Sequence, residues 1–234
     1  MMTKTALVTG ANKGIGFEIA KQLLEVGYRV LVGARDQKRG ETAVTALRKF
    51  GDAKLVLLDV ADLESIDNAV ITIKQNYPEL TLLVNNAGIP GDMHKPGWEF
   101  TVEELQATHQ VDFIGPFALS KGLLPLLIAN KGTIENISIP IEPLPYFNAF
   151  AYQTAKAPLN VMTKSWAMSF AQESIPVEIF AVMPGAVSTD LNGHITGDFV
   201  KTPAQAAELI VSFVLDDENH NGQVINYDGT LAEY

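Results

Sequence analysis

Tyr152 and Lys156 are four residues apart, which places both side chains on one face of a helix, about 6 Å apart along its axis. A tyrosine phenol has an ordinary pKa of about 10, too high for acid–base catalysis at neutral pH. A lysine ammonium within reach favours the phenolate, so we expect it to lower the pKa of Tyr152. The pair is a candidate for moving a proton to a carbonyl oxygen or from an alcohol, although an ordinary helix-face pair has the same spacing.

A second chemical signal is the segment Thr-Gly-Ala-Asn-Lys-Gly-Ile-Gly at residues 9–16, which joins a strand-like run to an amphipathic helical pattern. Its glycine spacing is a variant of the dinucleotide-binding fingerprint, although a glycine-rich turn without a ligand is the alternative. The first glycine allows a tight turn, the second lets the backbone approach a pyrophosphate, and the third lets the helix pack closely on the strand. The free amides at the start of the helix favour an anion. The candidate cofactor-binding residues here are Gly10, Asn12, Lys13, Gly14, Ile15 and Gly16.

The end of the second predicted strand distinguishes NAD from NADP. An NAD site places a carboxylate there to bind the ribose 2′-hydroxyl. Here Ala34 occupies that position and Arg35 follows it. Arg35 can pair with a 2′-phosphate through two N–H donors, and Lys13 adds a second positive charge. We therefore predict NADP(H) as the cofactor, with two solvated surface cations as the alternative.

Composition excludes several classes of function. The chain has 234 residues, 47% hydrophobic and 19% charged, which predicts a single domain over residues 1–234. A formal net charge of −10 argues against a nucleic-acid-binding surface. The chain has no cysteine, and its four histidines lack the spacing of a metal site. The most apolar run is too short to span a bilayer and no signal-peptide layout is seen, so we expect a cytoplasmic protein without metal, membrane or nucleic-acid partners.

Short β-branched runs alternate with helical patterns. We predict strands at residues 5–9, 29–33, 54–59, 80–85, 132–137, 177–182 and 223–227. Helical patterns lie at residues 14–26, 37–50, 63–77, 102–127, 151–170 and 203–215. Several strands are apolar on both faces, which is typical of parallel strands between two helix layers. The expected fold class is α/β, with one doubly wound parallel sheet and helices on both faces.

Further short motifs, spread over nearly the whole chain, accompany these two signals. They are Asp59-Val60, Asn85-Asn-Ala-Gly88, Tyr152-x3-Lys156, Pro184-Gly185 with Val187 and Thr189, and Gly222-Gln223 near Asp228-Gly229. With them the chain resembles the short-chain dehydrogenase/reductase family, close to its carbonyl-reductase-like branch. The resemblance implies a Rossmann-type domain with about seven parallel strands, NAD(P) as hydride carrier, and a homodimer or homotetramer.

The resemblance also assigns roles to the motif residues. It implies that Asp59 and Val60 flank the adenine, and that Asn86, Ala87 and Gly88 line the nicotinamide ribose. It further implies that Pro184, Gly185, Val187 and Thr189 hold the carboxamide and pyrophosphate. Lys156 would bind the nicotinamide ribose as well as assist Tyr152.

Two positions depart from the family pattern. The family usually has a serine thirteen residues before the tyrosine, where this chain has Ile139 and its neighbour Ser138. Because consecutive strand residues face opposite sides, Ser138 can replace that serine only if the strand end is bulged or the next loop is longer. Where the family usually has a helical asparagine, the chain has Asp112, which could accept a proton or pair with Lys156.

These departures leave two main interpretations. In the first, the chain is an NADP(H)-dependent carbonyl reductase acting on a small carbonyl or alcohol, with Tyr152, Lys156, Ser138 and Asp112 as catalytic candidates. In the second, it is an NADP(H)-binding sensor or partner-binding protein with little catalysis; dehydration or epimerisation is a third possibility. An apolar substrate cleft could be lined by Met93, Trp98, Phe147, Phe150 and Phe199, for which core packing is the alternative.

Overall fold

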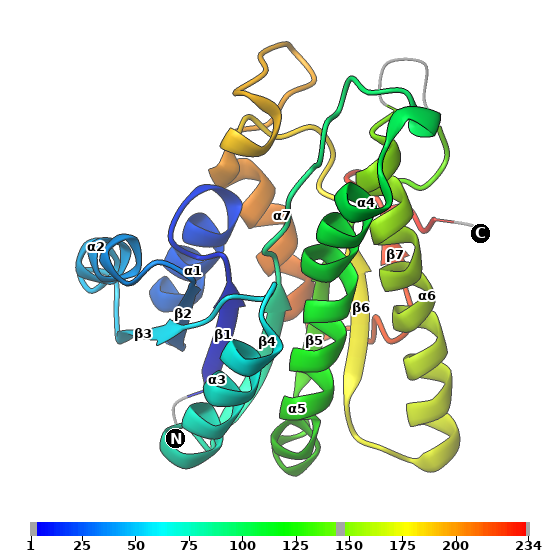
Figure 1. Cartoon of the computed structure of the whole chain (residues 1–234). Coiled ribbons are helices and arrows are strands. Elements are labelled where there is room, and N and C mark those ends of the chain that lie inside the picture. The colour runs from blue at the N-terminus through cyan, green and yellow to red at the C-terminus, as the bar shows by residue number, and fades with distance from the viewer. Residues whose placement is uncertain (1–3, 144–147, 233–234) are drawn as a thin grey trace.

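A seven-stranded sheet in the order β3-β2-β1-β4-β5-β6-β7 forms the centre of the molecule, and every neighbouring pair in it is parallel (Figure 1). The computed structural model describes residues 4–143 and 148–232. Its strands are β1 (Thr5–Thr9), β2 (Arg29–Ala34), β3 (Ala53–Leu57), β4 (Leu80–Asn85), β5 (Thr133–Ile137), β6 (Glu178–Val182) and β7 (Val224–Ile225). The predicted α/β class and doubly wound parallel sheet are confirmed.

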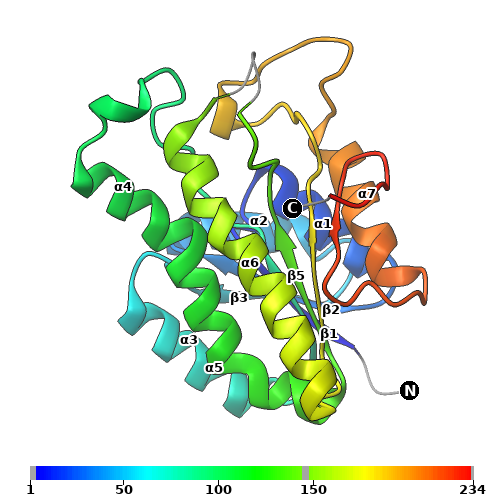
Figure 2. The same cartoon turned by 90° about the vertical axis from the view of Figure 1, so that its right-hand side faces the viewer.

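Helices cover both faces of this sheet, as the two views in Figures 1 and 2 show. They are α1 (Gly14–Glu25), α2 (Gln37–Leu47), α3 (Leu63–Asn76), α4 (Val102–His109), α5 (Gly115–Asn130), α6 (Phe150–Glu173) and α7 (Pro203–Leu215). One apolar core joins the sheet to α1, α2 and α7, and a second joins it to α3, α5 and α6. In β1, Val8 belongs to the first core and Leu7 to the second, so the strand must be apolar on both faces.

The helix predicted at residues 102–127 is present, but a π-helical turn divides it into two α-helices. α4 leads into a π-helical turn, η2 (Gln110–Ile114), and α5 then continues to Asn130. A π-helical turn adds one residue to the helix and is frequent at functional sites. Asp112 lies in this turn and is fully buried.

By length and composition alone, the stretch Val102–Asn130 would also suit a membrane span, and it is longer than the short apolar run seen in the sequence. Its apolar side, however, packs against α3 and the sheet as part of the second core. The structure therefore uses it as a core helix.

Reciprocal capping boxes fix where α4 and α7 begin, next to the segments that follow β4 and β6. Thr101 and Glu104 form a reciprocal capping box at α4. Thr202 caps α7 with Gln205, and Pro203 occupies the first turn.

Candidate active site

The carboxyl ends of β1 and β4 meet where the strand order reverses, the position at which open α/β sheets bind ligands. The Thr9 hydroxyl accepts hydrogen bonds from the amides of Asn86 and Ala87, both at 2.9 Å. The Asn86 side-chain amide donates to the Thr9 carbonyl at 2.8 Å. These bonds tie the glycine turn after β1 to the Asn-Ala-Gly segment after β4.

The geometry of the glycine turn fits a dinucleotide. Gly10 and Gly14 both have positive φ, +66° and +59°, a conformation that favours glycine. A Cβ on Gly16 would lie 2.4 Å from the Asn86 side-chain nitrogen, so this helix start has no room for a side chain. A Cβ on Gly14, in contrast, would meet only the Thr189 methyl within 4 Å among the described residues. Space therefore remains in front of the turn.

The first turn of α1 keeps its backbone donors available to a ligand. Lys13 occupies the N-cap position in an extended conformation, and no side chain among the described residues caps the helix there. The first amides of a helix need partners, and a phosphate group supplies suitable acceptors. The Gly14 cradle and the uncapped helix start together match the pyrophosphate of a dinucleotide.

Tyr152, Lys156 and Asp112 come together beside Gly88. A Cβ on Gly88 would lie 2.6 Å from Asp112 Oδ1 and 3.7 Å from the Tyr152 hydroxyl oxygen. Lys156 Nζ lies 3.2 Å from Asp112 Oδ1, and both side chains are buried. The Ile89 amide donates to Asp112 Oδ2 at 3.1 Å. The π-helical turn thus places the Asp112 carboxylate next to Tyr152 and Lys156, which share one face of α6.

This arrangement changes the acidity expected of Tyr152. Burial and, secondarily, the negative charge of Asp112 raise the pKa of Tyr152 above its ordinary value. The prediction that Lys156 lowers this pKa is wrong here, because burial of the phenol raises it and the charge of Lys156 is matched by Asp112 in a buried ion pair. The site therefore holds a protonated phenol, which suits donation of a proton to a substrate.

Ser138 does not join this cluster. β5 pairs regularly with β6 up to Ile137, and the Ser138 amide donates to the Val182 carbonyl, so no bulge reorients it. The Ser138 hydroxyl donates to Asn160 Oδ1 at 2.6 Å. Asn160 lies two helical turns, about 12 Å along the axis, beyond Tyr152. Ile139 is half-buried and offers no donor on its side chain.

Buried amides and hydroxyls hold α6 against the sheet and so position Tyr152. Asn85 donates to Asn136 at 2.8 Å, and Asn136 donates to Thr163 on α6 at 2.9 Å. Sequence reasoning missed Asn160 and Thr163. The signal for Asn160 was its spacing, since residues 152, 156 and 160 share one helix face.

The predicted adenosine-binding residues lie around the ends of β2 and β3. Arg35 is exposed, and no ion pair is found for it within residues 4–143 and 148–232. Asp59 is half-buried and accepts from the Ala61 amide, while Val60 is buried. Lys13 is engaged elsewhere: its ammonium pairs with Asp190 at 2.5 Å.

The segment after β6 forms the opposite wall of the site. Pro184 and Val187 are buried, and Gly185 has a φ of +79°. Thr189 packs its methyl group towards Gly14 and caps the short 3-10 helix η3 (Asp190–Asn192). The loops after β4 and β6 both rise above the carboxyl edge of the sheet, at the top of Figure 1.

Comparison with known proteins identifies the family. The sequence profile of the short chain dehydrogenase family matches residues 4–198. The chain belongs to the short-chain dehydrogenase family. Glucose 1-dehydrogenase 2 of Bacillus subtilis strain 168 is 32% identical over 193 residues, covering 81% of this chain and 74% of that protein.

Two solved structures share the fold over almost their full length. The NADPH-bound carbonyl reductase from chicken fatty liver is 26% identical, with a TM-score of 0.89 and full coverage of both chains. A metagenomic short-chain oxidoreductase in complex with NADP is 27% identical, with a TM-score of 0.79 and coverage of 95% and 96%. As a short-chain dehydrogenase, this chain is an oxidoreductase that uses a nicotinamide cofactor.

The aromatic residues predicted to line an apolar cleft of this short-chain dehydrogenase have different surroundings in the structure. The Phe150 ring packs at a tilt against Phe100, with ring centroids 5.9 Å apart. Trp98 and Phe199 are 87% and 73% exposed, in the loops after β4 and β6. Phe147 lies outside the described residues. Phe150 thus serves packing, while the two exposed rings are available to a ligand.

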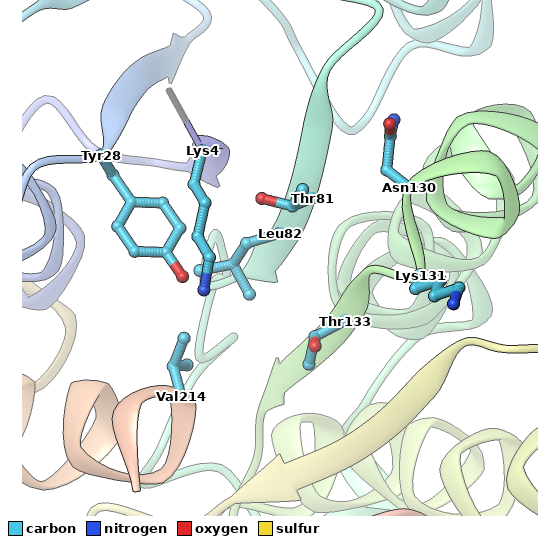
Figure 3. A pocket seen from close by; sticks show the side chains of 8 residues that line it. All are labelled: Lys4, Tyr28, Thr81, Leu82, Asn130, Lys131, Thr133 and Val214. Atoms are coloured by element: carbon cyan, nitrogen blue, oxygen red, sulfur yellow. The ribbon is translucent and has the colours of Figure 1, made fainter. Parts of the chain in front are cut away.

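A separate cavity of about 140 Å³ lies at the other end of the sheet (Figure 3). Its lining residues are Lys4, Tyr28, Thr81, Leu82, Asn130, Lys131, Thr133 and Val214. Several of them stand at the amino ends of β1, β2, β4 and β5, whereas the glycine turn follows the carboxyl end of β1. This cavity is therefore not part of the cofactor site.

Proposed function

We propose that this chain is an NADP(H)-dependent oxidoreductase that transfers a hydride between the nicotinamide and a small carbonyl or alcohol substrate, with Tyr152 as the acid–base residue. One observation carries the proposal. The Tyr152 hydroxyl, the Lys156 ammonium and the Asp112 carboxylate converge beside Gly88, next to the glycine turn. The overall similarity to an NADPH-bound carbonyl reductase supports the reductive direction.

The residues of the chain supply the proton chemistry. When bound, the reduced nicotinamide supplies the hydride that reaches the carbonyl carbon. Tyr152 donates its phenolic proton to the carbonyl oxygen, which becomes the alcohol hydroxyl. Tyr152 is 8% exposed, so most of the phenol is shielded from water while its hydroxyl remains within reach of a substrate. The Lys156 ammonium lies 5.6 Å from the centroid of the Tyr152 ring, and its pairing with Asp112 leaves no net charge next to the phenol.

One hydrogen-bond donor to the substrate oxygen is missing in this arrangement. Ile139 cannot donate, and the Ser138 hydroxyl is bound to Asn160. Loss of one such donor typically lowers kcat by about 100- to 1000-fold. We therefore propose a reductase with slow turnover, in which Tyr152 provides most of the stabilisation of the substrate oxygen.

NADP(H) is the preferred cofactor in this proposal. Ala34 leaves no carboxylate at the end of β2, and the exposed Arg35 guanidinium is available for a 2′-phosphate. We expect NADPH to bind at least about tenfold more tightly than NADH, as measured by competition in a fluorescence titration. Equal affinities would contradict the assignment.

The test of function combines binding with turnover. Purified protein is titrated with NADPH and then assayed for NADPH oxidation over a panel of aldehydes, quinones and diketones. We expect saturable binding and measurable oxidation of NADPH with at least one class of carbonyl. Tight binding without turnover over the whole panel would contradict the reductase and favour the NADP(H) sensor.

Tyr152→Phe removes the proton donor while keeping the ring. We expect turnover to fall by at least about 100-fold, because the substrate oxygen loses its general acid. The dissociation constant for NADPH should stay within about twofold, because the cofactor cradle is built from other residues. Steady-state kinetics and fluorescence titration measure the two effects. Unchanged turnover would refute the role of Tyr152.

A further inference from the structure

Lys201 closes the loop that follows β6. Residues 187 and 201 form an isolated parallel bridge, in which the Lys201 amide donates to the Ala186 carbonyl at 2.9 Å. The Ser188 amide donates to the Lys201 carbonyl at 3.0 Å. The two ends of the loop 188–200 are therefore joined to each other by backbone hydrogen bonds, and we call this junction the stem of the loop. Thr202, the next residue, caps α7 and anchors that stem.

The Lys201 side chain reaches from this stem to the turn after β6. Its ammonium donates to the Pro184 carbonyl at 3.0 Å and lies 4.5 Å from the centroid of the Tyr227 ring. A Cβ on Gly185 would lie 3.5 Å from the same ammonium and 3.3 Å from Tyr227. One cation thus contacts both the Pro-Gly turn and the C-terminal segment.

No carboxylate within the described residues forms an ion pair with Lys201, although the charge of Asp228 acts on it. Partial burial lowers the pKa of Lys201, which means that the ammonium has lost solvent without gaining a close counter-ion. Holding a lysine side chain in one conformation costs conformational entropy. The contacts with the Pro184 carbonyl and the Tyr227 ring offset that cost and hold the Lys201 side chain in place.

We propose that Lys201 is a positioning residue that fixes the Pro184–Val187 wall against which the nicotinamide end of the cofactor lies. This inference rests on the proposed function, because it takes the wall after β6 as part of the cofactor site. Lys201 acts through the Pro184 carbonyl and the turn at Gly185, and it has no part in the chemistry. Its loss should affect the nicotinamide end of the cofactor and spare the adenosine end.

Lys201→Met tests this directly, because it keeps the length of the apolar stem and removes the donor and the charge. NADPH affinity is compared with that of adenosine 2′,5′-bisphosphate, a probe that has the adenosine end and lacks the nicotinamide. We expect Lys201→Met to weaken NADPH binding by about tenfold or more, with less than about a twofold change for the probe in calorimetry. Lys201→Arg, which retains a donor and a cation over the ring, should restore most of the NADPH affinity.

Lys74→Met, an exposed substitution on α3, is the matched control and should leave both affinities unchanged. Equal weakening of NADPH and the probe would overturn the inference, because it would show general damage to the site. Unchanged NADPH affinity in Lys201→Met would overturn it as well. If the unsubstituted protein bound no NADPH, the proposed function and this inference would fail together; in the other two outcomes only the role of Lys201 is lost.

Discussion

Asp112 gives the site a charge that an asparagine at this position would not have. Its carboxylate faces Lys156 and Tyr152 on α6, and His109 on α4 also acts on it. Burial raises the pKa of Asp112, against the opposing influence of Lys156. The same carboxylate raises the pKa of Tyr152. The phenol therefore stays protonated over a wide pH range, which suits reduction better than alcohol oxidation.

Asp112→Asn removes this negative charge and keeps the shape of the side chain. The pKa of Tyr152 should then fall, because Lys156 acts on the phenol without a competing anion. Alcohol oxidation needs the phenolate, so at each pH below the pKa of Tyr152 its rate should be about tenfold higher or more than in the parent. Rates measured between pH 6 and about 10.5 check this.

Stability provides the accompanying control for Asp112→Asn. Removing one partner of a buried ion pair typically costs about 3–5 kcal/mol, so the unfolding free energy should fall. A variant that stays folded but shows the parent pH profile would contradict the role assigned to Asp112.

Two elements far apart in the chain meet above the cofactor cradle. Lys13 at the start of α1 pairs with Asp190 in η3, and His194 contacts the same carboxylate at 2.7 Å. The Lys13–Asp190 pair is more than half exposed, so its contribution to stability is small, about 0–1 kcal/mol. In the proposed cofactor site we expect its effect on ligands to be larger, because Asp190 competes with phosphate groups for Lys13 and adds a negative charge beside them.

Asp190→Asn should therefore tighten NADPH binding by about twofold to fivefold at low ionic strength. The gain should disappear in about 1 M salt, where exposed charges are screened within about 3 Å. Asp198→Asn, an exposed change in the same loop, should have a much smaller effect. Fluorescence titrations at the two salt concentrations measure this, and weaker binding by Asp190→Asn at low salt would contradict the prediction.

At the scale of the whole molecule, the least expected feature is an acidic residue in the core. Glu135 lies in β5, paired with Val84 on one side and Phe180 on the other, and it is completely buried. Neither carboxyl oxygen has a hydrogen-bond partner in the described part of the chain. Burial raises the pKa of Glu135 well above its ordinary value, so the folded protein holds the acid in its neutral form.

The pH dependence of this effect has a definite sign. The unfolded chain releases the Glu135 proton near its ordinary pKa, whereas the folded chain retains it. The contribution of Glu135 to folding is therefore most favourable below the ordinary pKa and declines as the pH rises towards the folded-state pKa.

Glu135→Gln should remove this decline. The free energy of unfolding of Glu135→Gln minus that of the parent should be roughly 1–3 kcal/mol larger at about pH 8 than at about pH 5. Urea denaturation at the two pH values measures both free energies. Glu25→Gln, an exposed change at the end of α1, is the control and should show no such gap. A constant difference between Glu135→Gln and the parent at both pH values would contradict the prediction.

Much of this architecture follows from local sequence patterns. Strands that are apolar on both faces predict a sheet between two helix layers, and the glycine turn predicts where the ligand lies. The spacing of Tyr152 and Lys156 correctly predicts a shared helix face. These features depend on residues close together in the chain, so periodicity and turn chemistry are sufficient to find them.

The features that could not be predicted depend on contacts between distant residues. Asp112 contacts Lys156 from within a π-helical turn, and no residue pattern in the sequence predicts that turn. The pKa of Tyr152 was predicted in the wrong direction because burial and Asp112 outweigh the lysine. Lys201 stood in an irregular stretch, and its contact with Pro184 depends on how the loop after β6 returns to the sheet.

The bonds between Thr9 and Asn86 have a consequence for synthesis on the ribosome. They join residues 77 positions apart, and Asn86 also fills the space beside Gly16. A nascent chain that has emerged only as far as β3 already contains the whole glycine turn, yet it lacks the strand that braces it. Nucleotide therefore cannot assist the earliest stage of co-translational folding, and its stabilising effect begins only after β4 has left the exit tunnel and paired with β1.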